Sequence, residues 1–292
     1  MSTYLALTLD PLHIGAGGYR LGRVDNTIVR DAGTGLPKVP GSSLAGVIRC
    51  YAGWNLEQGQ TSCDKGNCGH CPICAIFGYA AGDDKSRDDK EKQSHIGLLR
   101  FYDGHILAFP VRTMSGPVWV TCPSVLAARG FALDETPGNE ELLVNFDVNK
   151  PAGVKESRLN LGWLYLPCRK LKKTDLGLKL GKAAALLRRF AVAPDWLFGE
   201  IVNSNLEVRT SVSIDPKTGS AQSGLLFTYE AIPAATLLAF DIEVDAYRCQ
   251  EYSADAVRAL LARSLRLCAT LGMGGMVTRG FGRVEFLAEE GK

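Results

Sequence analysis

The sequence predicts an α+β fold with a ferredoxin-like, split β-α-β order of elements. Three observations predict it. A strand-like segment at residues 3–9 precedes a glycine-rich loop and an amphipathic helix that begins after Pro40. A second amphipathic helix, residues 255–271, precedes another glycine-rich loop and a strand at residues 283–287. Between them lie short alternating segments that are typical of strands, such as residues 237–244.

Composition and charge place few limits on function. The chain has 292 residues, which is enough for one large domain or two small ones with an ample core. Its net charge of +2 does not demand a nucleic-acid partner, so any such partner must bind a local basic strip.

The N-terminal segment, residues 1–9, is apolar but short, and it lacks the basic region and the cleavage site of a signal peptide. No apolar run reaches transmembrane length. We therefore expect a cytoplasmic protein without a membrane partner. The nine cysteines agree with a reducing compartment, because four are clustered and the other five are scattered singly, at Cys50, Cys122, Cys168, Cys249 and Cys268.

The glycine-rich loop after the first strand is the first candidate binding site. Gly15, Gly17 and Gly18 permit positive φ and allow backbone N–H groups to approach a ligand closely. A phosphate backbone suits such a loop.

The helix predicted after Pro40 offers a second anion site. Ser42 or Ser43 is expected to be its N-cap, and the free N–H groups of a helix N-terminus attract anions. Lys38 and Arg49 add positive charge. Neither of the common nucleotide-binding glycine motifs is present, so the stretch favours an extended polyanion over a nucleotide. The buried stripe of this helix is predicted at Leu44, Val47, Ile48 and Tyr51.

A cysteine cluster predicts a metal site within an insertion that spans residues 55–95. Four thiolates at short spacing suit tetrahedral zinc, and four protein ligands leave no position for a substrate, so the predicted role is structural. An iron–sulfur cluster is the alternative, but the early fourth cysteine favours zinc. His70 lies inside the cluster and is a substitute ligand. The cluster reads Cys63-x4-Cys68-x2-Cys71-x2-Cys74.

The middle of the chain predicts mostly short elements. Residues 82–95 carry mixed charges and are expected to form a solvated loop. Two strands joined by a tight turn at Asp103-Gly104 are expected within residues 95–110. The other predicted elements are a strand at 116–122, a short helix at 123–129, an irregular stretch at 130–160, a strand at 161–168 and a helix at 176–190.

In residues 206–231, apolar and polar residues alternate on both sides of a DPKTG turn, which predicts a long β-hairpin. One interpretation is an edge hairpin of the sheet. The other is a projecting hairpin that contacts RNA through Arg209 and Lys217 and places apolar side chains against bases.

A second glycine-rich loop, residues 272–282, connects the last predicted helix to the last strand. Gly274 and Gly275 again permit a close backbone approach, and Arg279 and Arg283 add positive charge. The two ends of the chain therefore carry similar candidate sites for a phosphate backbone.

Five motifs together resemble a known family. LHIGAG, VDNTIVRDAGTGLPKVPGSSLAGVIR and GMGGMVTRGFGRV are similar to the signatures of the RAMP superfamily of type III CRISPR effectors. Residues 106–123 and the predicted hairpin are similar to the subunit that forms the repeated backbone of the type III-B, or Cmr, complex. The resemblance runs almost end to end.

The resemblance implies one RAMP domain over residues 1–292, with a ferredoxin-like palm and a thumb formed by the hairpin. It implies several copies stacked as a filament along a CRISPR guide RNA, together with other RAMP and large subunits. In the family, which serves antiviral defence, each thumb interrupts the duplex of guide and target, and the subunit cuts the target RNA at regular intervals.

The resemblance also implies roles for particular residues. The catalytic aspartate of the family maps to Asp25, the family histidine to His13, and an acidic residue of the thumb to Glu230. Arg30 of the same motif is expected to contact RNA, and a divalent cation such as Mg²⁺ is expected for cleavage. From the residues alone, a turn cap acting through Asn26 is the better interpretation of Asp25, and only the family pattern favours catalysis. For His13, the residues favour a structural and a catalytic histidine equally.

The chain also departs from the family. A lysine commonly follows the Ser-Leu of the first helix, whereas this chain has Ala45, so that Lys38 or Arg49 must supply any phosphate contact there. The cysteine cluster is better known in other type III relatives, which keeps a Csm-type backbone subunit as an alternative. The alternatives to a target-cleaving subunit are a purely architectural RNA-binding subunit and a stand-alone endonuclease that processes guide RNA.

Overall fold

The computed structural model describes residues 2–17, 24–56, 71–80, 94–149, 156–172, 188–249 and 252–290. Within them, the helices are α1 (Gly41–Trp54), α2 (Pro72–Phe77), α3 (Pro123–Ala128), α5 (Asp195–Ser204), α6 (Ala254–Leu271) and the short 3-10 helix η2 (Val277–Arg279). The strands are β1 (Ser2–Thr8), β2 (Lys38–Val39), β3 (Gly78–Tyr79), β4 (His95–Ile96), β5 (Leu99–Phe101), β6 (Gly104–Thr113), β7 (Gly116–Thr121), β8 (Leu142–Val144), β9 (Arg158–Leu161), β10 (Leu164–Lys170), β11 (Phe190–Val192), β12 (Glu207–Ile214), β13 (Ala221–Ala231), β14 (Leu237–Val244) and β15 (Val284–Glu290).

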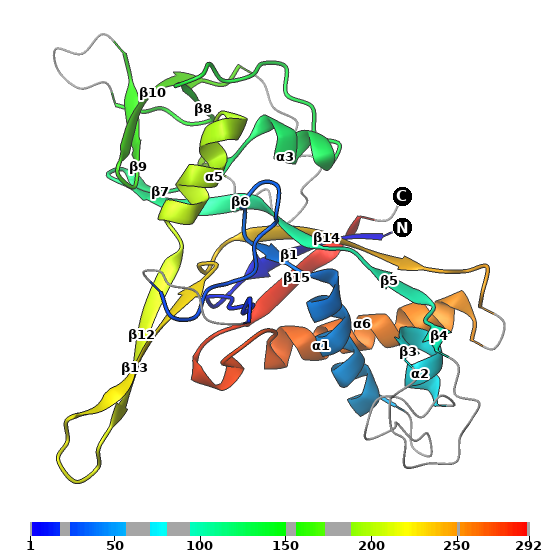
Figure 1. The fold of residues 1–292 in the computed structure, drawn as a ribbon. Helices are drawn as coiled ribbons and strands as arrows, with labels where there is room; N and C mark the ends of the chain where they lie inside the picture. Colours follow the sequence, from blue (N-terminus) through cyan, green and yellow to red (C-terminus); the bar gives the residue numbers. More distant parts are fainter. Residues whose placement is uncertain are drawn as a thin grey trace.

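One large sheet has the strand order β15-β1-β14-β6-β7-β11-β8-β10-β9, with β2 beside β6 and β5 beside β14. Among the strand pairs of the described residues, only β7–β11 and β8–β10 are parallel. The long strand β6 pairs with β14 through its first half and with β7 through its second half, so it joins the two parts of the molecule seen in Figure 1. The β15-β1-β14-β6 part lies next to α1 and α6, and the other part carries α3 and α5.

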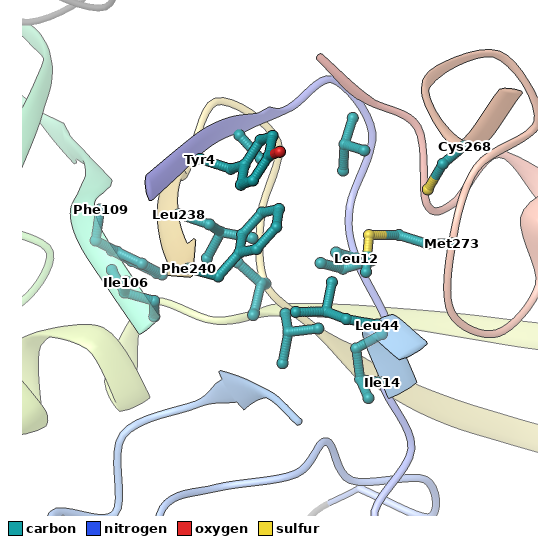
Figure 2. Close-up of a cluster of buried hydrophobic side chains, with 14 of the residues drawn as sticks. Tyr4, Leu12, Ile14, Leu44, Ile106, Phe109, Leu238, Phe240, Cys268 and Met273 are labelled. Carbon is teal, nitrogen blue, oxygen red and sulfur yellow. The ribbon is translucent and has the colours of Figure 1, made fainter. Parts of the chain in front are cut away.

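Both faces of the β15-β1-β14-β6 strands are buried. Tyr4 and Ala6 of β1 belong to the larger apolar cluster, where Tyr4 stacks on Phe240 with ring centroids 5.6 Å apart. Figure 2 shows this cluster, to which α1 contributes Leu44. Leu5 and Leu7 alternate with these residues along β1 and belong to a second cluster on the other face of the sheet. The period-2 alternation of a strand explains the division.

The hairpin predicted at residues 206–231 is present. Strands β12 and β13 pair antiparallel from Glu207–Ala231 to Ile214–Ala221 and form a sheet of their own. In Figure 1 this hairpin projects away from the body of the molecule. Exposed apolar side chains, such as Ile214 and Leu226, lie along it. It is therefore not an edge of the large sheet.

Several sequence predictions are confirmed. The strands near residues 3–9, 116–122, 237–244 and 283–287 and the helices near 41–54, 123–129 and 255–271 are all present. The segment predicted as irregular, 130–160, contains only the short β8 and the start of β9 among its described residues, 130–149 and 156–160. The predicted loop at 82–95 and the predicted helix at 176–190 lie almost wholly outside the described residues, and Phe190 begins β11.

The predicted hairpin around Asp103-Gly104 is wrong. Strands β5 and β6 do not pair with each other, because both pair with β14, one after the other along its length. The Asp103 side chain instead accepts a hydrogen bond from the backbone N–H of Gly41, with N and Oδ1 2.8 Å apart. The single strand predicted at 161–168 is a hairpin of β9 and β10, and α5 was not predicted.

No helix among the described residues is both long enough and apolar enough to cross a membrane.

Candidate active site at the base of the hairpin

The base of strand β13 collects the residues that the sequence singled out. An extended segment around Asn26 runs parallel to β13: the N–H of Asn26 donates to the Thr228 carbonyl oxygen, and the N–H of Glu230 donates to the Asn26 carbonyl oxygen, each at 3.0 Å. Leu12 is paired with Ile232, two residues after Glu230. Two segments from the N-terminal part of the chain are thus held on the last residues of the hairpin strand.

Asp25 is exposed, and its carboxylate is bound by Thr228. Its Oδ2 atom accepts hydrogen bonds from the N–H of Thr228 at 2.8 Å and from the Thr228 hydroxyl at 2.7 Å. The backbone hydrogen bond, followed by the hydroxyl bond, holds the pKa of Asp25 below its ordinary 3.8. The carboxylate is therefore ionised at neutral pH. Its contact is with β13 rather than with its neighbour Asn26, so the turn-cap interpretation does not describe it.

His13 is buried, with 8% of its surface exposed, beside the same strand. Its Nδ1 atom lies 2.6 Å from the Glu230 carbonyl oxygen. A carbonyl only accepts, so the proton is assigned to Nδ1. The ring meets Tyr229 edge-on, with centroids 5.8 Å apart. On the other side, a Cβ added to Gly15 would be 3.2 Å from Nε2. This packing favours the structural interpretation of His13.

Glu230 and Arg30 form an ion pair of 2.6 Å, with 10% and 27% of their side chains exposed. Glu230 also accepts from the N–H of Ile28 at 3.2 Å. Arg30 donates further to the Ile28 carbonyl oxygen and to Asn203 of α5, both at 3.2 Å. The predicted catalytic and RNA-binding roles of this pair are untested, but its contacts join β13, the N-terminal segment and α5.

The second glycine-rich loop packs against the first. Gly274 has φ +84°, and a Cβ on it would lie 2.6 Å from the His13 carbonyl oxygen. The N–H of Gly275 donates to that oxygen at 2.8 Å. The close approach that the glycines permit is therefore at least partly intramolecular. Gly17 is different: it has φ +70°, no atom of the described residues lies within 4 Å of a Cβ added to it, and Gly18 lies outside the described residues.

The predicted basic side chains lie along the hairpin and beside the second glycine-rich loop, and some of them are already engaged by the protein. Arg279 is exposed on η2. Arg209 lies over the Phe281 ring at 4.7 Å and donates to the Gly280 carbonyl oxygen at 3.2 Å, so it joins the hairpin to the second glycine loop. Lys217 lies in the turn at the tip of the hairpin. Arg283, which with Arg279 flanks the second glycine-rich loop, forms an ion pair with Asp10 at 2.5 Å.

The anion site predicted at the start of α1 is already occupied by the protein. The N-cap is Pro40 and makes no side-chain hydrogen bond, so the prediction of Ser42 or Ser43 as N-cap is wrong. The carboxylate of Asp103 bonds the first N–H of the helix and pairs with Lys38 at 2.7 Å. The helix begins two residues earlier than an N-cap at Ser42 would place it, and its first N–H is bonded by a residue 62 positions later in the chain.

Arg49, predicted to contact RNA, points elsewhere. Its guanidinium donates to the Gly78 carbonyl oxygen and to the Cys74 sulfur, the latter at 3.4 Å. It therefore connects α1 to the cysteine-rich insertion rather than to the glycine loops.

Only half of the predicted metal site is described. Cys63 and Cys68 lie outside the described residues, which contain no cluster of three or more metal-binding side chains. Cys71 and Cys74 are both buried at the start of α2, where the Cys71 sulfur accepts from the N–H of Cys74 at 3.4 Å. Buried thiols that receive N–H donors suit thiolate ligands, so this half fits a zinc site.

A family model described as the RAMP superfamily matches residues 6–285. The chain belongs to the RAMP superfamily. Its resemblance to the type III-B backbone subunit is also confirmed, because it is 26% identical to the "CRISPR system Cmr endoribonuclease Cmr4" of Pyrococcus furiosus over 97% of this chain and 95% of that one. A second relative is the "CRISPR system Cms endoribonuclease Csm3" of Methanothermobacter thermautotrophicus, 39% identical over 26% of this chain and 31% of the relative.

Solved structures share the fold of this RAMP protein. "Oligomeric Cmr4 from Pyrococcus furiosus" matches with a TM-score of 0.61 and 22% identity, over 99% of both chains. A chain of "Type III-B Cmr-beta bound to cognate target RNA" matches with a TM-score of 0.66 and 16% identity, over 98% of this chain and 95% of that one. The Cmr4 relative matches nearly the whole chain and the Csm3 relative only 26% of it, which favours the Cmr-type over the Csm-type assignment.

Two residues of this RAMP protein, Thr228 and Asp103, gave no functional signal in the sequence. Thr228 is one of several Ser and Thr residues in an alternating hairpin, and nothing in that pattern distinguishes it. The structure singles it out through its contact with Asp25, 203 residues away in the chain.

Proposed function

We propose that this chain is a guide-RNA-binding backbone subunit of a type III-B effector complex and that it cuts the complementary target RNA. The observation that carries the proposal is the exposed, ionised carboxylate of Asp25, fixed at the base of a projecting hairpin. The match to a Cmr endoribonuclease along nearly the whole chain supports it.

RNA supplies its own nucleophile, the 2′-hydroxyl, so the protein must align that oxygen with the phosphorus and manage charge. In our proposal the hairpin displaces a nucleotide and Asp25 accepts the hydroxyl proton or binds a hydrated divalent cation. One exposed carboxylate suits Mg²⁺, which keeps several waters and takes further oxygen ligands from phosphates. Such a cation would stabilise the negative charge that develops on the phosphate oxygens.

We infer a ferredoxin-like palm from the order of elements. Along the chain, β1-α1-β6-β14-α6-β15 form the core, and in space the strands follow the order β15-β1-β14-β6. The β12–β13 hairpin would be the thumb. One solved homologue, Cmr4 from Pyrococcus furiosus, is oligomeric, which supports repeated copies of the chain along the guide RNA.

We also infer that the cysteine-rich insertion, residues 55–95, holds a structural zinc ion through Cys63, Cys68, Cys71 and Cys74. The burial of Cys71 and Cys74 and the N–H donor on the Cys71 sulfur support this inference.

The decisive experiment replaces Asp25 by Asn in a complex assembled with guide RNA and supplied with target RNA. Interval cleavage should fall by at least about 100-fold, while binding of the target stays within about twofold, because the change removes charge but little volume. Asp147→Asn is the matched control, since Asp147 is an exposed carboxylate in the other part of the molecule, paired with Lys170. Divalent-ion dependence is read from the same assay with a chelator.

Other outcomes would identify the other functions. Interval cleavage by the Asp25→Asn complex would leave this chain an architectural role. Cutting of repeat RNA by the isolated subunit would instead identify a stand-alone processing enzyme.

A further inference from the structure

Thr228 makes a reciprocal set of hydrogen bonds with Asp25. The Thr228 hydroxyl donates to Asp25 Oδ2 at 2.7 Å and accepts from the backbone N–H of Asp25 at 2.9 Å. The backbone N–H of Thr228 donates to the same Oδ2 atom at 2.8 Å. Three hydrogen bonds therefore join Thr228 of the hairpin to Asp25, two of them to the proposed catalytic carboxylate and one to the backbone N–H.

We propose that Thr228 is the positioning residue of the cleavage site: it orients the Asp25 carboxylate and couples its location to the hairpin. The proposal rests on the proposed function and deepens it. Thr228 contacts Asp25 and acts through it.

The bonding pattern selects one carboxylate oxygen. A carboxylate oxygen offers two lone-pair sites, and Thr228 supplies two donors to Oδ2. Oδ1 is then the atom directed to the reaction. A threonine hydroxyl has a single proton, so donating it to Oδ2 and accepting from the N–H of Asp25 fixes its rotation as well.

The backbone around this contact makes the carboxylate follow the hairpin. Asn26 is bonded to β13 on both sides of Tyr229 in an isolated parallel bridge, so the segment that carries Asp25 is attached to the hairpin base. A nucleic acid held by the hairpin is therefore held at a fixed distance from Asp25 Oδ1. Because a misplacement of about 1 Å can lower a rate about 100-fold, this coupling would set both the place and the speed of the cut.

The chain offers a matched test. Thr228→Val keeps the shape and the strand preference of the side chain but removes the hydroxyl, whereas Thr228→Ser keeps the hydroxyl. Thr210 is the direct cross-strand partner of Thr228 on β12 and is exposed, so Thr210→Val makes the same change on the same face of the hairpin without touching Asp25. Thr228→Ala removes the same hydroxyl with a smaller side chain and must behave like Thr228→Val.

In assembled complexes at saturating target, we expect Thr228→Val to lower the single-turnover cleavage rate about 10- to 100-fold, with target affinity and the spacing of the cuts unchanged. Thr228→Ser should stay within about threefold of the wild type, and Thr210→Val should match the wild type. A wild-type rate in Thr228→Val, or a loss of rate in Thr228→Ser as large as in Thr228→Val, would overturn the proposal.

A second measurement does not depend on cleavage. Hydrogen exchange at the Asp25 amide, in the complex with guide RNA but without target or divalent cation, should be faster in Thr228→Val and unchanged in Thr228→Ser and Thr210→Val. Equal exchange in all four proteins contradicts the positioning role. If Asp25→Asn still cleaves, the proposed function fails; if Asp25→Asn is inactive and Thr228→Val is fully active, only the role of Thr228 fails.

Discussion

The Nδ1 atom of His13 lies 2.6 Å from the carbonyl oxygen of Glu230 and joins the N-terminal loop to the hairpin base. The ring is buried and is enclosed by Tyr229, Gly15 and Gly275. The His13 carbonyl oxygen in turn accepts from Gly275. One residue thus connects both glycine-rich loops to the strand that holds Asp25.

We predict that His13→Ala lowers the free energy of unfolding by about 2–3 kcal/mol, because it removes a buried ring and leaves the Glu230 carbonyl oxygen without its donor. His13→Asn should recover most of this loss, since its amide N–H can take the place of Nδ1–H. Urea denaturation of the purified subunit measures both.

The same pair of variants tests whether the His13 imidazole takes part directly in RNA cleavage. Because the ring faces the protein interior, His13→Asn should retain most interval cleavage in the assembled complex. A stable His13→Asn protein that binds target normally but does not cut would assign the imidazole a direct role.

Gly274 should tolerate a side chain far less well than Gly17. Both have positive φ, so alanine costs about 1 kcal/mol or more at either position. At Gly274 the added Cβ would also meet the His13 carbonyl oxygen at 2.6 Å and Ile14 at 2.8 Å, which adds about 1–3 kcal/mol. We expect Gly274→Ala to unfold at clearly lower urea concentration than Gly17→Ala. Equal midpoints would show that the loop moves aside freely.

The fold was largely predictable because its strongest signals are local. The apolar period of α6 and the alternation of β14 and of the hairpin strands each arise within one element. The prediction of a hairpin around Asp103-Gly104 is wrong because a DG pair indicates a turn but does not determine whether the strands on either side of it pair with each other. There, both flanking strands found a better partner in β14, which lies more than 130 residues later in the chain.

The site was predictable only in part, for a related reason. The motif resemblance singled out Asp25 as the candidate catalytic aspartate, and the structure places it beside the predicted hairpin. What sequence could not supply was the pairing register of the segment around Asn26 with β13, which decides that Thr228, rather than a neighbour, meets Asp25. Nor could it show that Asp103 fills the anion site at the start of α1.

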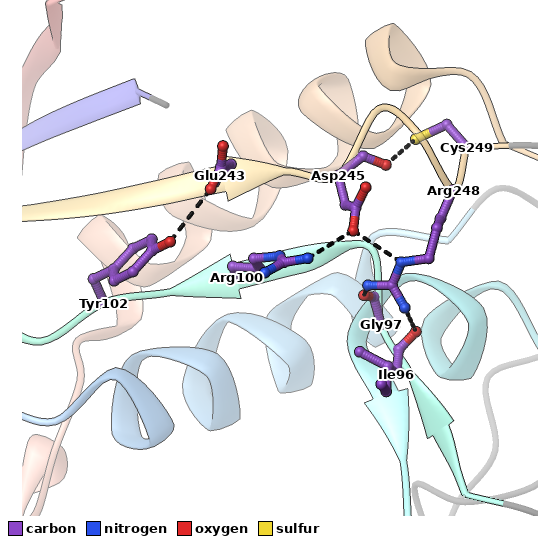
Figure 3. Close-up of polar contacts among 8 residues, drawn as sticks. All are labelled: Ile96, Gly97, Arg100, Tyr102, Glu243, Asp245, Arg248 and Cys249. Carbon is purple, nitrogen blue, oxygen red and sulfur yellow. Dashed lines mark hydrogen bonds and ion pairs between the residues drawn. The ribbon is translucent and has the colours of Figure 1, made fainter.

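Acid should weaken the attachment of the insertion to the sheet. Asp245, at the end of β14, is bound by Arg100 and Arg248, and Arg248 also donates to the carbonyl oxygens of Ile96 and Gly97 beside β4 (Figure 3). The two arginines, Arg100 first, lower the pKa of Asp245 from 3.8 to about 2.

Because this folded-state pKa is depressed, the stabilisation is present above about pH 4 and is lost as the pH falls towards 2. We predict that Asp245→Asn has a shallower dependence of unfolding free energy on pH in this window, measured by urea denaturation. Glu243→Gln is the control, because it changes a carboxylate on the same strand that contacts only the Tyr102 hydroxyl in Figure 3. An Asp245→Asn slope as steep as the wild type contradicts the prediction.

The cysteine-rich insertion should depend on zinc. Cys71 and Cys74 are buried at the start of α2, and Arg49 of α1 donates to the Cys74 sulfur. Cys74→Ser should therefore remove bound zinc and loosen the contact between α2 and α1, which lowers the melting temperature of the subunit. Metal analysis of the purified protein should find one zinc per wild-type chain and less than about half of that in the variant.

Cys50→Ser is the matched control, because Cys50 is an exposed cysteine of α1 outside the cluster. It should retain both the zinc and the melting temperature. Since four thiolates and a closed coordination sphere predict a structural role, a chelator should lower the melting temperature of the wild type towards that of Cys74→Ser. Bound iron with visible absorbance would contradict zinc and support the iron–sulfur alternative. Full zinc content in Cys74→Ser would place the ligands elsewhere.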